Sequence, residues 1–65
     1  MTYTIYDKET NEYFAGTYGD LEIVEVLENI TDTEPDRAQF YEFEDERGEK
    51  YSYWDLCLKY GIIPF

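Results

Sequence analysis

The chain has 65 residues, of which 16 are Asp or Glu, 5 are Lys or Arg and none is His, so its formal net charge at pH 7 is −11. Such a polyanion repels nucleic acids and anionic membranes, which argues against direct binding to either and favours a protein partner with a basic surface. Aromatic residues make up 20% of the chain, and their large buried surface suits one small folded domain over residues 1–65 rather than a disordered segment.

The first segment predicts a β-hairpin. The stretches TYTIY and EYFAG flank the polar run DKETN, in which Asn11 suits the left-handed position of a turn over 7–11. We expect strands at 2–6 and 12–16. A turn of this length places Ile5 opposite Tyr13.

The next segment, GDLEIVEVLENI, predicts an amphipathic helix over 19–30. At 100° per residue, one face is apolar and consists of Ile23, Val24, Val26, Leu27 and Ile30. The opposite face carries Glu22, Glu25 and Glu28. Because Ile23, Val24 and Val26 are β-branched, a strand is the alternative. The following stretch, TDTEPDRAQ, predicts a loop broken at Pro35.

A second hairpin is predicted from FYEFE and KYSYW, with Gly48 at the left-handed position of the intervening turn. The turn fixes a register in which one face is aromatic and the other charged. Its expected pairs are Glu44 with Lys50, Phe43 with Tyr51, Glu42 with Ser52, and Tyr41 with Tyr53.

A short helix over 53–60 follows. Ser52 and Asp55 have the spacing of a capping box, in which the hydroxyl and the carboxylate satisfy backbone N–H groups reciprocally. Gly61 is the expected C-terminal stop. This capping accounts for Ser52 and Asp55 without a ligand.

The expected fold is therefore α+β, with element order ββα-ββα. The two hairpins form one antiparallel sheet of up to four strands, and the two short helices pack on one face of it. The halves align at an offset of 35 residues, which matches TYGDL with SYWDL and Ile5 with Phe40. Shared local chemistry explains this similarity more simply than duplication does.

The residue content argues against an enzyme. Without His, the chain lacks the commonest general base, and Cys57 has no His to activate it. The stretch DTEPD resembles the start of a calcium loop, but Arg37 and Phe43 stand where such a loop needs Gly and Glu. We predict no catalytic residues, no metal site and no cofactor.

The cysteine count and the N-terminal residues indicate the cellular compartment. A single Cys excludes an internal disulfide and favours a reducing environment. The N-terminal residues lack the pattern of a signal peptide, and no apolar run approaches the length of a membrane span. We expect a cytoplasmic protein.

The arrangement of acids suggests the first function. Three acidic rows are expected: Glu22, Glu25 and Glu28 on the first helix; Asp32, Glu34 and Asp36 on the loop; and Glu42, Glu44 and Glu46 on a strand. Regular rows of carboxylates can imitate the phosphates of nucleic acid at a basic protein site. In size and charge only, the chain resembles the small acidic phage and plasmid proteins that block restriction or CRISPR machinery. The alternative is an acidic surface that serves solubility alone.

The last helix suggests the second function. It is apolar on nearly every side, and a domain of this size can bury one of them. Trp54, Leu58 and Tyr60 are the candidate contact residues for a partner or for a homodimer through this helix. In the alternative, the final residues IIPF fold back and cover the helix.

Overall fold

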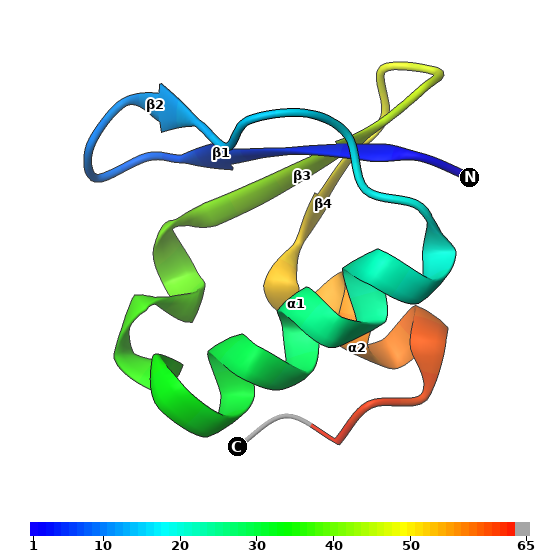
Figure 1. Cartoon of the computed structure of the whole chain (residues 1–65). Coiled ribbons are helices and arrows are strands. Elements are labelled where there is room, and N and C mark those ends of the chain that lie inside the picture. Colours follow the sequence, from blue (N-terminus) through cyan, green and yellow to red (C-terminus); the bar gives the residue numbers. More distant parts are fainter. Residues whose placement is uncertain (64–65) are drawn as a thin grey trace.

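A four-stranded antiparallel sheet carries both α-helices on one of its faces (Figure 1). The computed structural model describes residues 1–63. Its elements are β1 (Tyr3–Asp7), β2 (Glu12–Tyr13), α1 (Asp20–Thr33), the 3₁₀-helix η1 (Pro35–Phe40), β3 (Tyr41–Asp45), β4 (Lys50–Ser52) and α2 (Tyr53–Tyr60). The strand order is β2-β1-β3-β4, so β1 and β3 join the two hairpins. The predicted α+β class and its sheet are confirmed.

The first hairpin has a register one residue away from the predicted one. Tyr6, rather than Ile5, lies opposite Tyr13, and the next pair is Asp7 with Glu12. The prediction was wrong because it assigned Asp7 to the turn. In the structure Asp7 closes β1, and its side chain accepts backbone N–H groups of the loop that follows. The loop therefore covers only 8–11.

The second strand of this hairpin is much shorter than the predicted 12–16. The chain leaves the sheet after β2 ends at Tyr13 and bends at Gly16, which has the left-handed φ of 78°. It rejoins β1 at Tyr18, whose backbone exchanges two hydrogen bonds of 2.8 and 2.9 Å with Tyr3. Asn11 has a φ of 60°, as the turn prediction required.

α1 is a helix, as predicted, and the alternative of a strand is wrong. Gly19 is the N-cap residue, and Glu22 Oε1 accepts its backbone N–H at 3.0 Å. The helix continues to Thr33, beyond the predicted end at residue 30. Pro35 stops it there, because proline disfavours the α conformation in the residue before it. Most of the predicted loop is therefore helical, first in α1 and then in η1.

The second hairpin confirms three of the four predicted pairs. Gly48 has the expected left-handed φ of 85°. The confirmed pairs are Glu44 with Lys50, Phe43 with Tyr51, and Glu42 with Ser52. The fourth pair, Tyr41 with Tyr53, is wrong because Tyr53 is the first residue of α2.

The ends of α2 match the prediction. Ser52 Oγ accepts the backbone N–H of Asp55 at 3.1 Å, and Asp55 Oδ2 accepts that of Ser52 at 3.3 Å. Gly61 ends the helix with a φ of 71°. These bonds occupy both side chains in helix capping.

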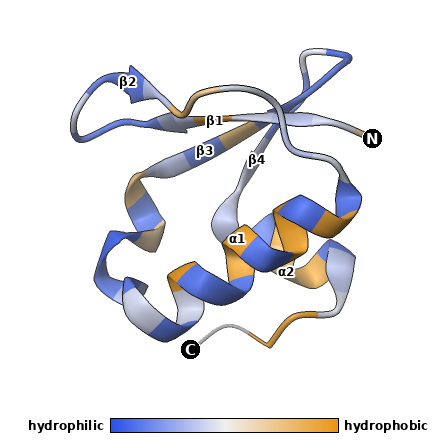
Figure 2. Ribbon diagram, in the orientation of Figure 1, coloured by the Kyte–Doolittle hydropathy of each residue, from blue (hydrophilic) through white to orange (hydrophobic). Residues whose placement is uncertain are grey.

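The core lies between the inner face of the sheet and the helices. Its buried residues are Tyr3, Ile5, Tyr41 and Phe43 from the sheet, Ile23, Leu27 and Ile30 from α1, Ala38 from η1, and Tyr53, Leu56 and Cys57 from α2. Figure 2 shows the amphipathic character of α1 as orange and blue segments that alternate along the helix. The helix buries only one side, which leaves its acids to solvent.

The two halves of the fold do not repeat at a constant offset. Asp7 and Asp45 end the two central strands and lie 38 positions apart, whereas the N-cap residues Gly19 and Ser52 lie 33 apart. The offset of 35 also matches Ile5 with Phe40, which belongs to η1. The similarity of TYGDL and SYWDL is therefore not a structural repeat in this register.

Candidate functional site

The exposed side of α1 carries four of the nine predicted site acids. They recur every three or four residues, on the side away from the buried Ile23, Leu27 and Ile30. We call this set the α1 acidic stripe; it consists of Glu22, Glu25, Glu28 and Asp32, all exposed. From the first to the last it extends about 15 Å along the helix axis, or one carboxylate per about 5 Å. One DNA strand presents a phosphate per about 3.4 Å of axis.

The stripe keeps its negative charge uncompensated within residues 1–63. None of the ion pairs formed there involves a stripe residue. Asp32 lies near the C-terminal end of α1, where no basic residue is present and the helix dipole disfavours an anion. Glu28 lies four residues before it, so two like charges face each other on the helix surface.

The second predicted row does not lie on a loop. Asp32 belongs to α1, and Asp36 is exposed in the first turn of η1. Glu34 lies between the two helices and is partly buried. Its carboxylate accepts the Tyr41 hydroxyl at 3.5 Å and lies 3.9 Å from Arg37 Nε. The charge of Glu34 is therefore partly compensated within the chain.

The third predicted row is broken and lies elsewhere. Glu42 and Glu44 alternate with the buried residues of β3, so they face away from the helices. Glu46 lies in the hairpin loop, where it accepts the Thr2 backbone N–H at 3.4 Å. Lys50 is opposite Glu44 in the register, but its Nζ is 3.8 Å from Glu42 Oε1. Because α1 covers the other face of the sheet (Figure 1), the nine acids do not form one surface.

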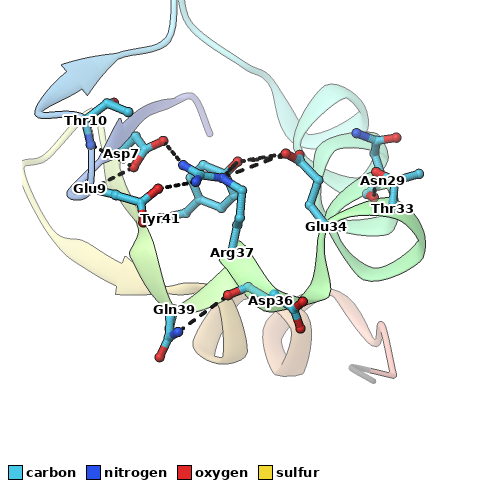
Figure 3. A network of polar contacts seen from close by, with 10 residues as sticks. All are labelled: Asp7, Glu9, Thr10, Asn29, Thr33, Glu34, Asp36, Arg37, Gln39 and Tyr41. Atoms are coloured by element: carbon cyan, nitrogen blue, oxygen red, sulfur yellow. Dashed lines mark hydrogen bonds and ion pairs between the residues drawn. The ribbon is translucent and has the colours of Figure 1, made fainter.

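Arg37 is the centre of a polar network that the sequence analysis missed (Figure 3). Its guanidinium pairs with Asp7 and Glu9 of the first hairpin and approaches Glu34 at the end of α1. The carbon of the guanidinium lies 5.7 Å from the centre of the Tyr41 ring. Arg37 thus ties the first hairpin to the helices. No periodicity relates these positions, and only the scarcity of cations in the sequence hinted at a special role.

Two buried carboxylates belong to the fold rather than to the site. Asp7 and Asp45 each accept backbone N–H groups from the loop that follows their strand. Burial opposes their ionisation, but these bonds outweigh it. Arg37 assists at Asp7, and the Tyr51 hydroxyl assists at Asp45. The pKa of each carboxyl is consequently lower than its ordinary value of 3.8.

Two of the three residues predicted as apolar contacts on α2 are exposed. Trp54 and Leu58 are 44% and 85% exposed and lie one helical turn apart. Tyr60 is partly buried, and its hydroxyl donates to Asp20 Oδ1 at 2.7 Å and lies 2.8 Å from the Tyr3 hydroxyl. Tyr60 therefore connects α2 to the rest of the fold, which leaves Trp54 and Leu58 as the exposed pair.

The described residues after α2, 61–63, leave Leu58 largely exposed. Ile62 packs against the core, whereas Ile63 is 87% exposed. Pro64 and Phe65, the other part of the predicted covering segment, lie outside the described residues.

Other candidate chemistry is limited. Cys57 lies in the core, and burial raises the pKa of its thiol in spite of a hydrogen bond with Tyr53. In the part of the chain that the structure describes, no three Asp, Glu or Cys side chains are grouped so that they could hold a metal ion. No helix among residues 1–63 has the length and apolarity needed to cross a membrane.

Comparison with known proteins returned no match among protein-family models, curated proteins or solved structures.

Proposed function

We propose that this chain is a non-enzymatic, cytoplasmic interaction module that binds a basic site on another protein, in the manner of a nucleic-acid mimic. The α1 acidic stripe is the contact surface. The observation that carries this proposal is the contrast between the stripe, whose acids have no cationic partner within residues 1–63, and Glu34 and Glu42, which lie close to Arg37 and Lys50. A basic partner supplies the missing countercharge.

Helix chemistry argues that the stripe does more than keep the chain in solution. Solubility requires net charge but does not depend on where the charge lies. Asp32 opposes the helix dipole, and Glu28 with Asp32 forms a repulsive pair, so both positions reduce the stability of α1. Residues that break local rules without a structural benefit are candidates for a role in binding.

Capture of partners under salt and nucleic-acid competition tests this proposal. The immobilised chain is exposed to cell extract at about 50 mM and at about 500 mM NaCl, because screening weakens contacts between exposed charges. We expect basic DNA- or RNA-binding proteins to be retained at low salt only and to be displaced by added duplex DNA or RNA. If the retained proteins respond neither to salt nor to added nucleic acid, mimicry is contradicted. If no basic protein is retained, the proposed function is contradicted.

A second candidate, self-association through α2, is favoured by the exposed Trp54 and Leu58. It predicts a solution mass near twice 7.8 kDa that returns to the monomer value in Leu58→Asp. Sedimentation at increasing protein concentration measures this. A wild-type monomer at every concentration would eliminate the dimer and leave the anionic proposal unaffected, because the stripe lies on α1.

A further inference from the structure

A groove of about 290 Å³ opens between α1 and the segment that leads from β2 to α1. Its apolar lining includes Phe14, Tyr18, Val26 and Tyr41, and carboxylates are contributed by Glu22, Glu25 and Glu34. None of the five Lys and Arg residues lines it. The groove therefore combines aromatic rings with carboxylates, of which only Glu34 is partly compensated, by Arg37.

The shape of the lining suits a long side chain with a cationic end. Phe14 and Tyr41 meet edge to face, with ring centres 5.6 Å apart. Apolar walls of this kind pack against a methylene stem, while nearby carboxylates bind the charged end. Phe14 is 37% exposed, so its ring is accessible to a bound group.

The chain already binds one guanidinium with the same chemistry. Arg37 lies among the carboxylates of Asp7, Glu9 and Glu34 and approaches the ring of Tyr41. Two of these groups, Glu34 and Tyr41, also line the groove. A second guanidinium in the groove would meet Glu25 and Phe14 in addition to these shared groups.

We infer that the groove receives an arginine side chain of the partner. This inference rests on the proposed function and makes it more specific, since the groove lies beside the α1 acidic stripe and shares Glu22 and Glu25 with it. Arginine fits better than lysine because its planar group stacks on aromatic rings and offers a fork of N–H donors to carboxylates.

The test is an NMR titration of the isotope-labelled chain with acetyl-tetra-arginine amide. The matched peptide in which citrulline replaces arginine keeps the shape but lacks the charge. We expect saturable shifts in the resonances of Phe14, Tyr18, Val26 and Tyr41 with the arginine peptide and none with the citrulline peptide. Shifts of equal size along all of α1, without emphasis on the groove, would overturn the inference.

Two variants and one control variant test which residues bind the arginine peptide. Glu25→Gln removes a groove carboxylate, and Phe14→Leu keeps apolar bulk but removes the ring; each should weaken peptide binding about fivefold. Glu12→Gln removes the same charge from β2, outside both the groove and the α1 acidic stripe, and should change binding less than twofold. Equal losses in Glu25→Gln and Glu12→Gln would show attraction by diffuse charge only. The dispersion of each amide spectrum reports whether the variant is folded.

The groove and the proposed function can fail separately. Diffuse peptide binding together with salt-sensitive capture of a basic protein would remove the groove site and leave the module. Specific binding of arginine in the groove without capture of any basic protein would remove the proposed function and leave a site for small guanidinium ligands.

Discussion

The double reversal Glu28→Lys/Asp32→Lys should weaken binding to the basic partner by about 100-fold at low salt while the chain stays folded. Each reversal turns an attraction into a repulsion, and like charges across an interface cost several kcal/mol. The change in net charge is two units per site, from −11 to −7, which lowers self-repulsion. Lys at position 32 also suits the C-terminal end of α1, where a cation contributes about 0.3–1 kcal/mol. Titration calorimetry with the captured partner and thermal melting measure the two effects.

The matched control is Glu12→Lys/Glu46→Lys. It gives the same net charge of −7, but its sites are exposed and lie in β2 and in the loop between β3 and β4. If the α1 acidic stripe is the contact surface, this control should retain binding within a few-fold of the unaltered chain. Equal losses in the two double variants would mean that the partner responds to net charge alone. That result would leave the stripe without a specific role.

Phe43→Ala should leave much of the protein unfolded at 37 °C. Phe43 is fully buried in β3, between Ile5 of β1 and Tyr51 of β4 in the sheet. Truncation of a buried Phe lowers the free energy of unfolding by about 3–5 kcal/mol. Small domains have total stabilities near the low end of about 5–15 kcal/mol. Urea unfolding monitored by circular dichroism measures the difference in the free energy of unfolding between Phe43→Ala and the unaltered chain.

Phe40→Ala is the control for this core substitution. Phe40 is the last residue of η1 and is partly exposed, with the Arg37 guanidinium 5.9 Å from its ring centre. Truncation of Phe40 should lower the free energy of unfolding clearly less than truncation of Phe43 does. The two variants also compare two assignments for Ile5. The sheet places Phe43 opposite Ile5, whereas the sequence match at an offset of 35 residues relates Ile5 to Phe40. A larger loss in Phe40→Ala would contradict the central position of Phe43.

The predicted site was most reliable where one element carries the whole pattern. The acids of α1 share a face because a helix of any packing repeats every 3.6 residues, so Glu22, Glu25 and Glu28 needed no tertiary information. The strand row failed at Glu46, where a turn had already begun. The groove is lined by residues of the β2–α1 connection, of α1 and of β3. Its formation depends on how the chain returns to β1 at Tyr18, which no local pattern encodes.

Local chemistry by itself determined the two hairpins and the two α-helices, the acidic face of α1, the ends of α2 and the register of the second hairpin. These features depend on helical periodicity, capping bonds and left-handed turn positions that involve residues close in sequence. Only the tertiary structure decided the pairing of β1 with β3, the shifted first hairpin, and the network that joins Arg37 to Asp7. These involve residues far apart in the chain, selected by burial and by the scarcity of cations among many acids. For the same reason, only the folded chain could separate acids compensated from within, such as Glu34, from those of α1 that form no ion pair within residues 1–63.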